Sequence, residues 1–312
     1  MAAIPNPGTR TLSLAQRDTL LAMSMVLPAI LYIVLLLGIP IVLAVVYSLN
    51  DVTTGSSAMR FVGLENFTAL LETPDFLGAI GNTFNITLST LVGVLVLGTI
   101  QAELLVRPVR GKWLIRFLIL LPWTAPASLS VIAWLWMFDS TFSPIDWVLR
   151  GLGLLGHQGA LFGDFDNTFW LGRSGFALFS IILVNVWRLL PLGTVIILAG
   201  LNGVPRDILE QSEIDGAGYF RRLFHIILPM LIPVFGVTIL FTFVFVFTDI
   251  ITVFILTRGG PANATQVLPT LAFFTGVQGG SLGRGAATAL FLLPVLAAVS
   301  IVILSLIRRR EI

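Results

Sequence analysis

The chain has 312 residues, of which 56% are hydrophobic and only 11% are charged. A soluble globular chain carries roughly 25% charged residues, so this composition excludes an ordinary soluble protein and places the chain in lipid. The formal net charge is +2 without a long basic block, so nucleic acid is not an expected partner. Cysteine is absent and the two histidines, His157 and His225, are far apart in the sequence, so we expect no metal site.

Long apolar runs are spread along the whole chain. A helix needs roughly 20 mostly apolar residues to cross a hydrocarbon layer about 30 Å thick. The runs of that length are 20–49, 76–102, 117–138, 174–205, 226–257 and 285–307. The sequence therefore predicts an all-α membrane protein with about six transmembrane helices in a single domain, residues 20–307. The tails, 1–19 and 308–312, flank this domain.

Three runs need comment. The first is preceded by Arg10 and Arg17, as a secretory signal would be, but it is far longer than a signal core of roughly 7 to 15 residues. We interpret it as an uncleaved anchor. In the third run Pro122 and Pro126 predict a kink, which a helical bundle tolerates because neighbouring helices satisfy the freed carbonyls. The run 264–277 is too short to span, so we expect a helix in an outer loop.

The distribution of basic residues predicts the orientation. Lysine and arginine near the ends of spans favour the cytoplasm. Twelve of them fall on the side that carries both termini, and the other side has only Arg60, Arg150, Arg173, Arg258 and Arg284. Both termini are therefore expected in the cytoplasm, together with the loop 202–230 between the fourth and fifth spans. Trp113, Trp134, Trp136 and Trp147 are expected near the two membrane interfaces.

The loop between the fourth and fifth spans contains PRDILEQSEIDGAGYFRRLFHIILP. Pro205 suits the first position of a helix, Asp207 and Glu210 suit the positive end of the helix dipole, and Gly216 suits the residue just past its end. A second short helix is expected from Tyr219 until a proline, Pro229, stops it.

An amphipathic helix lying on the membrane surface is one interpretation of this loop. Such helices carry lysine and arginine on their polar face. Here the first half has a single base, Arg206, and four acids, which are Asp207, Glu210, Glu213 and Asp215. Anionic lipid attracts bases and should repel acids, so docking onto a protein groove that supplies arginine or lysine is the favoured interpretation.

The loop resembles the coupling loop of the membrane subunits of ABC importers, which reads approximately Glu-Ala-Ala, three residues, Gly, nine residues, Ile-x-Leu-Pro. The two alanines are replaced here by Gln211 and Ser212, and the matching residues are Glu210, Asp215, Gly216, Ala217, Ile226, Leu228 and Pro229. The resemblance implies that these residues couple the chain to an ATPase. It also implies the type I importer permease fold.

Further motifs are similar to the carbohydrate branch of this family, typified by maltose and glycerol-phosphate permeases. They are FVGLENF at 61–67, Asn82 with Thr83, Trp187 with Pro191, and LTRGGPANAT at 256–265. The resemblance implies a subunit of a bacterial inner-membrane importer that moves a sugar by alternating access, the sugar being an oligosaccharide, a disaccharide, or a sugar or polyol derivative. An ABC permease for a non-sugar solute and an ion-coupled secondary transporter remain alternatives.

The same resemblance implies several partners. These are a second homologous permease subunit, two copies of an ABC ATPase, an external or lipid-anchored substrate-binding protein, and the membrane lipid. A phosphate-binding loop would end in Gly-Lys-Ser or Gly-Lys-Thr, whereas Gly111-Lys112 is followed by Trp113. We therefore expect no catalytic residue and no cofactor in this chain, with ATP and Mg bound by the partner ATPase.

Arg188 and Asp249 are ionisable residues within apolar spans, each costing about 2.5 to 3.5 kcal/mol on insertion scales. They pair with each other as a structural ion pair, or one of them touches the substrate. A sugar site mixes polar side chains with aromatic rings. The further candidates for a substrate path are Trp123, Asn185, Trp187, Thr242 and Thr248.

Overall fold

The computed structural model describes residues 14–56, 58–108 and 110–309. It is mainly helical, with one short antiparallel ribbon in which Asn50 pairs with Phe61 and Asp51 with Arg60. The elements in chain order, with π-helical turns labelled η, are α1 (Leu14–Ile33), η1 (Val34–Gly38), α2 (Ile39–Ser48), β1 (Asn50–Asp51), β2 (Arg60–Phe61), α3 (Glu65–Leu71), α4 (Pro74–Val106), α5 (Lys112–Thr124), α6 (Ala127–Met137), α7 (Pro144–Gly151), α8 (Ser174–Asn202), α9 (Arg206–Ile214), α10 (Tyr219–Arg222), η2 (Leu223–Ile227), α11 (Leu228–Met230), α12 (Ile232–Phe247), α13 (Ile251–Leu256), α14 (Leu268–Phe273), η3 (Phe274–Gln278), α15 (Leu282–Leu290) and α16 (Leu292–Arg308).

Within these ranges, four helical runs are long and apolar enough to cross a membrane, namely Leu21–Ser48, Pro74–Val106, Ser174–Asn202 and Leu282–Arg308. Two bent pairs also pass by length and composition when each pair is taken together. They are α5 with α6, bent by 98°, and Tyr219–Met230 with α12, bent by 67°. Counting each pair as one span gives six, which confirms the predicted all-α membrane fold. The orientation of the termini stays a prediction.

The third predicted span is not one continuous helix. α5 ends at Thr124 and α6 begins at Ala127, so a turn of 98° replaces the expected kink. Ala125 has an extended backbone, with ψ 141°, directly before Pro126. A proline disfavours helical geometry at the preceding residue, and this restriction breaks the helix completely here.

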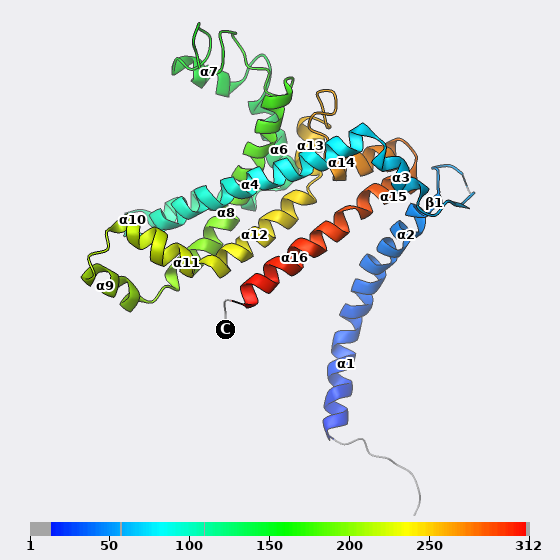
Figure 1. Cartoon of the computed structure of the whole chain (residues 1–312), viewed down its shortest axis with the longest axis horizontal. Helices are drawn as coiled ribbons and strands as arrows, with labels where there is room; N and C mark the ends of the chain where they lie inside the picture. The colour runs from blue at the N-terminus through cyan, green and yellow to red at the C-terminus, as the bar shows by residue number, and fades with distance from the viewer. Residues whose placement is uncertain (1–13, 57, 109, 310–312) are drawn as a thin grey trace, which may run out of the picture.

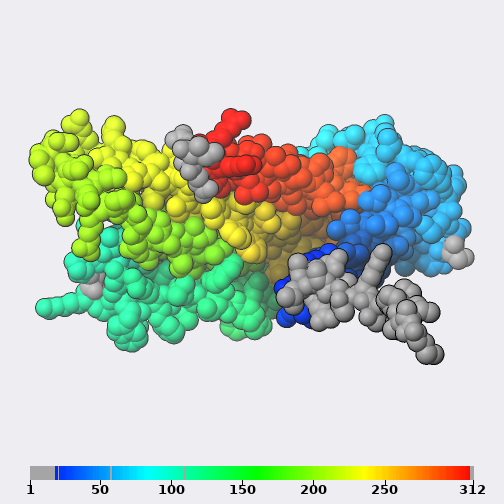
Figure 2. Space-filling view, turned by 90° about the horizontal axis from the view of Figure 1, so that it is seen from below, coloured from blue at the N-terminus to red at the C-terminus, as the bar shows by residue number. Residues whose placement is uncertain are grey.

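A bundle of long helices forms the body of the molecule, with α4 packed along α8 and α12, and α16 packed on α12 (Figure 1). The segment α9–α10 lies at one end of these helices, and α2, α3 and the β-ribbon lie at the other end (Figures 1 and 2). Close packing depends on small residues: a Cβ on Gly193 of α8 would lie 2.5 Å from a methyl carbon of Val94 on α4.

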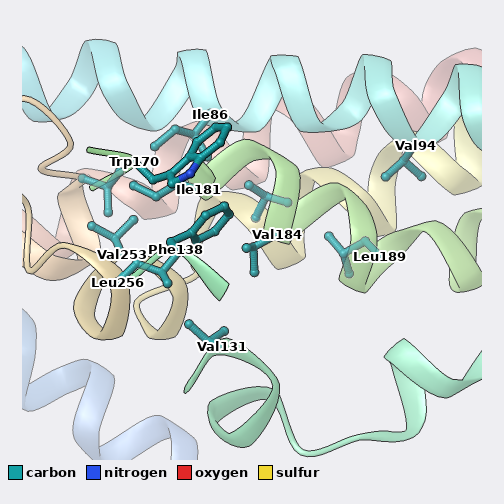
Figure 3. Close-up of a cluster of buried hydrophobic side chains, with 12 residues drawn as sticks. Ile86, Val94, Val131, Phe138, Trp170, Ile181, Val184, Leu189, Val253 and Leu256 are labelled. Carbon is teal, nitrogen blue, oxygen red and sulfur yellow. The ribbon is translucent and has the colours of Figure 1, made fainter. Parts of the chain in front are cut away.

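The main core cluster joins α8 to the loop between α6 and α8. Ile181, Val184 and Leu189 of α8 belong to the same buried cluster as Phe138, at the end of α6, and Trp170, which precedes α8 (Figure 3). The indole of Trp170 is 3% exposed and its ring centroid lies 5.7 Å from that of Phe138. The loop between α6 and α8 is therefore anchored to the bundle by large side chains.

The first span leaves the body of the molecule. None of the residues in its most apolar window is buried, and Figure 1 shows the helix diverging from the bundle. Only its far end is held, by packing of α2 on α15 and by the amide of Asn66, which donates to the carbonyls of Ser48 and Asn50 at 2.9 and 3.0 Å. Asn66 belongs to the FVGLENF motif, so part of this motif is structural.

Candidate functional site

Most of the candidate site residues lie in two regions, the segment α9–α11 at one end of the bundle and a cavity among α5, α8 and α12. α9 begins at Arg206, so Pro205 immediately precedes the helix rather than occupying its first position, and Asp207 is the acid in the first turn. Leu209 packs against the buried cluster of Ala102, Ile197, Ile227 and Leu231. One apolar side chain thus ties α9 to the bundle.

The turn after α9 requires a glycine. Gly216 follows the helix with φ +71°, in the left-handed region, and a Cβ there would meet nothing within 4 Å. The amides of Gly216 and Ala217 donate to the carbonyls of Glu213 and Ser212 at 3.0 and 2.9 Å and close the helix. Backbone conformation, and not crowding, selects glycine at this position. The structure therefore places Gly216 just past the helix end, as predicted.

The outer face of this segment combines acids with exposed apolar side chains. Glu210 and Asp215 are exposed, and Glu213 is 64% exposed although it pairs with Arg222. Ile214 is 85% exposed and Phe220, in the next helix, is 72% exposed. Exposed apolar side chains next to charged ones in the sequence are typical of a protein-binding surface.

The second helix of the segment ends close to the predicted position. It begins at Tyr219, as expected, and continues through η2 and α11 to Met230, one residue beyond Pro229. A break at Leu231 follows, where the chain bends by 67°. Of the other motif residues, Ile226 and Leu228 are half-buried and Ala217 is half-buried at the turn.

The cavity lies where two helix breaks face each other. It has a volume of about 400 Å³, and its lining includes Ala125 and Ala127 beside the α5–α6 break and Thr248 to Ile251 at the α12–α13 break. The fifth predicted run, 226–257, is therefore not one continuous helix. Trp123, Arg188, Thr248 and Asp249 from the predicted substrate path all line this cavity.

Arg188 and Asp249 form the ion pair that the sequence suggested, with Nη2 and Oδ2 3.2 Å apart. The two carboxylate oxygens of Asp249 also accept the amide N–H groups of Ile251 and Thr252, at 3.1 and 3.3 Å, and so cap α13. Arg188 donates to Oδ1 of Asn185 at 3.2 Å. Both charges therefore have polar partners besides each other, which offset part of the cost of burying them.

Three other candidates lie outside this cavity. Trp187 lines a neighbouring cavity of about 300 Å³ together with Gln101, Pro122 and Pro191. Asn185 and Thr242 are 1% and 2% exposed, and neither lines the two cavities. Asn185 instead supports the ion pair through Arg188. A role of any of these residues in a substrate path stays a prediction.

Among the lining residues that were not predicted, Phe245 and Gln101 have the most specific contacts. Phe245 lines the larger cavity and packs edge-on against Trp123, with centroids 5.6 Å apart. Gln101 lines the smaller cavity and accepts a hydrogen bond from the hydroxyl of Thr194 at 2.9 Å. A polar amide inside an apolar span was a readable signal for Gln101, whereas Phe245 is one of 23 phenylalanines and carries no such signal.

A third, larger cavity lies at the loop end of α6. Its volume is about 820 Å³, and Trp136, Asp139, Phe142 and Phe169 are among its lining residues. The amides of Phe142 and Thr141 donate to the Asp139 carboxylate and hold its pKa below the usual value. Part of this cavity therefore has an aromatic wall beside a fixed negative charge.

This arrangement defines a multi-pass membrane protein with an exposed acidic segment at one end and, between broken helices, a cavity whose wall contains an ion pair. Residues 94–311, more than half of the chain, match the family described as the binding-protein-dependent transport system inner membrane component, and the chain belongs to that family.

Several relatives are similar over more than four fifths of their length. The chain is 31% identical to the sulfoquinovosyl glycerol transport system permease protein SmoG of Agrobacterium fabrum, covering 97% of this chain and 94% of that protein. It is 29% identical to the trehalose/maltose transport system permease protein MalF of Thermococcus litoralis, covering 84% and 85%. It is 28% identical to the sn-glycerol-3-phosphate transport system permease protein UgpA of Pectobacterium atrosepticum, covering 94% and 96%.

A solved structure has the same fold. A bacterial ABC transporter involved in the import of the acidic polysaccharide alginate matches with a TM-score of 0.76 and 18% identity, over 94% of this chain and 96% of that chain. The alginate transporter in complex with its pentasaccharide-bound periplasmic protein matches with a TM-score of 0.77. At this identity the match shows the fold alone.

Proposed function

We propose that this chain is the permease subunit of a binding-protein-dependent ABC importer that carries a sugar, or a sugar or polyol derivative, across the bacterial cytoplasmic membrane. Three relatives named for sulfoquinovosyl glycerol, trehalose/maltose and glycerol 3-phosphate support this substrate class. The chain itself is not catalytic in this proposal. ATP and Mg bind to separate ATPase subunits, and the chain moves its substrate by alternating access.

The exposed face of α9 is the observation that carries the coupling role. Glu210 and Asp215 project from the bundle beside Ile214, while Leu209 anchors the helix from behind. An ATPase groove that offers an arginine or lysine to Glu210 and an apolar pocket to Ile214 matches both features. Movement of the ATPase would then displace α9 together with the bundle residues around Leu209. This role places α9 and both termini in the cytoplasm.

The cavity between the two helix breaks is the proposed substrate path. Trp123 offers a ring face for the apolar side of a sugar, and Thr248 offers a hydroxyl to its polar groups. Arg188 and Asp249 hold the cavity wall in place through their ion pair. A second homologous permease subunit completes the path, and an external or lipid-anchored binding protein delivers the sugar.

Affinity capture of the tagged chain from its native membrane tests the coupling role. We expect an ABC ATPase to co-purify with the wild-type chain and to be lost from the Glu210→Lys variant. Glu72→Lys is the matched control, because Glu72 is an exposed acid next to α3 at the opposite end of the bundle. Uptake that continues without any ATPase would contradict the proposal and favour an ion-coupled transporter.

The substrate class needs a separate experiment. The binding protein that co-purifies with the complex is screened by thermal shift against sugars, polyol phosphates, amino acids and peptides. Stabilisation by a sugar or polyol derivative is expected. Stabilisation by an amino acid or peptide alone would leave the permease role intact and overturn the sugar assignment.

A further inference from the structure

The loop between α4 and α5 and the first turns of α5 carry four basic residues within ten positions, Arg107, Arg110, Lys112 and Arg116. Arg107 is engaged, since its guanidinium lies 5.3 Å from the ring centre of Tyr219. Among the described residues, Arg110, Lys112 and Arg116 take part in no ion pair, and Arg110 and Arg116 are exposed. In the part of the chain that the structure describes, these three cations therefore lack an anionic partner, although Nζ of Lys112 lies 3.5 Å from the carbonyl oxygen of Val106.

The first turns of α5 carry two adjacent rows of side chains, one basic and one aromatic. Lys112 and Arg116 are four residues apart, so they share one face of the helix, and Trp113 and Phe117 share the adjacent face. Trp113 is 75% exposed and Phe117 is 56% exposed. At 1.5 Å per residue the two cations of the stripe are separated by about 6 Å along the helix axis. This separation is comparable to the depth of one headgroup layer, roughly 5 to 8 Å.

The loop lies at the same end of the bundle as α9 but carries the opposite charge. Arg107 contacts Tyr219 of α10, and Figure 2 shows the teal segment around residue 110 along one edge of this end and the yellow-green α9–α10 segment along the other. α9 is acidic and unsuited to anionic lipid, whereas the start of α5 joins unpaired cations to tryptophan and to the apolar residues of a membrane helix. Each edge therefore suits a different partner.

We propose that Arg110, Lys112, Arg116 and Trp113 form a binding site for the phosphate headgroup of an anionic phospholipid. The arginine guanidinium groups bind phosphate oxygens in pairs, and the positive end of the α5 dipole adds to the attraction. Trp113 lies at the interface, and Phe117 and Leu118 contact the acyl chains below it. α5 also carries Trp123, which lines the cavity between the two helix breaks, so a lipid bound at the start of α5 fixes the helix that lines the proposed path.

Native mass spectrometry of the full chain, with the subunits that co-purify with it, tests this site. Detergent-solubilised complex is exposed to equal concentrations of phosphatidylglycerol and phosphatidylcholine, and the lipid retained is measured. We expect preferential retention of phosphatidylglycerol by the wild type. In Lys112→Gln/Arg116→Gln we expect the apparent affinity to fall by roughly 25-fold, since each base near an anionic surface contributes a factor of about five.

The matched control is Arg308→Gln/Arg309→Gln, which removes the same charge from exposed positions at the end of α16. This variant should retain phosphatidylglycerol as the wild type does. Lys112→Arg/Arg116→Lys should also retain it and shows that the fold tolerates changes here. An equal loss in the control, equal retention of phosphatidylcholine, or unchanged retention in Lys112→Gln/Arg116→Gln overturns the site.

The lipid-retention test can fail without the coupling proposal failing, and the reverse also holds. The variants leave α9 unchanged, so an ATPase should still co-purify with them. Loss of the ATPase without any loss of phosphatidylglycerol would show that the cations bind protein and would overturn the lipid site.

Discussion

Nη2 of Arg188 lies 3.2 Å from Oδ2 of Asp249, and these side chains are only 11% and 7% exposed. The two residues come from α8 and from the break between α12 and α13. Their contact joins helices that are about 60 residues apart in sequence. The same carboxylate caps α13, so one group fixes both the ion pair and the helix break.

Removal of one partner of this pair should destabilise the protein. Arg188→Met leaves a buried carboxylate without its cation, which costs about 3 to 5 kcal/mol for a buried pair. The double variant Arg188→Met/Asp249→Leu should lose less than the sum of the single variants, because no charge is left unpaired. Chemical unfolding in detergent, followed by circular dichroism, measures these differences. If Arg188 contacts the solute instead, Arg188→Met will change the order of preferred solutes.

The turn at Gly216 gives a prediction for coupling. Gly216→Ala should cost about 1 to 2 kcal/mol, because its backbone is left-handed and an L-residue is strained there. The adjacent open space means that no clash adds to this cost. Gly218→Ala is the control, since Gly218 has φ −65° and equally open surroundings. Captured ATPase should decrease for Gly216→Ala and remain unchanged for Gly218→Ala; equal effects would refute the conformational explanation.

The crossing of η3 and α15 should tolerate no side chain at Gly285. A Cβ there would lie 2.4 Å from the Cα of Gly276 and 2.9 Å from the carbonyl oxygen of Ala272, and backbone cannot move aside cheaply. Gly285→Ala should therefore destabilise the protein by about 2 kcal/mol or more. Gly81→Ala in α4 has nothing within 4 Å and should be neutral or stabilising, because alanine favours helix. Thermal unfolding of both variants in detergent checks the contrast.

Asp146 should hold the loop between α6 and α8 in its folded conformation. Its buried carboxylate accepts the indole N–H of Trp170 and the amide of Thr168, both at 2.9 Å. Asp146→Ala leaves these donors unpaired, at about 1 to 3 kcal/mol for each buried group. We expect faster proteolysis of this loop than in the wild type. Asp164→Ala, at an exposed position in the same loop, should be cleaved at the wild-type rate.

The number and type of the spans were predictable from the sequence because hydrocarbon thickness fixes the length of an apolar run. The end of α9 was predictable for a similar reason, since a left-handed turn selects glycine at Gly216. The roles of Asn82 and Thr83 depend on long-range hydrogen bonds. The side-chain amide of Asn82 donates to the carbonyl of Gln266, and the hydroxyl of Thr83 accepts the amide N–H of Leu268. Such partners cannot be read from local pattern.

The positions and angles of the helix breaks were the main features that the sequence did not predict. Pro126 lies at a break that redirects the chain by 98°, and Pro229 is the second-last residue of a helical run that ends in a bend of 67°. Both prolines lie at or next to a bend, but the local sequence does not give its angle. The break at Asp249 has no proline at all, and its stability depends on Arg188, which lies far away in the sequence.

The first span has no buried residue in its apolar window, while its helical run from Leu21 to Ser48 is continuous. Such a helix satisfies its own backbone hydrogen bonds and is stable in lipid without help from later segments. During synthesis it can therefore enter the bilayer before the rest of the chain has emerged from the ribosome. Asn66 would then attach it to the body once α3 has formed, which makes the order of translation compatible with the order of assembly.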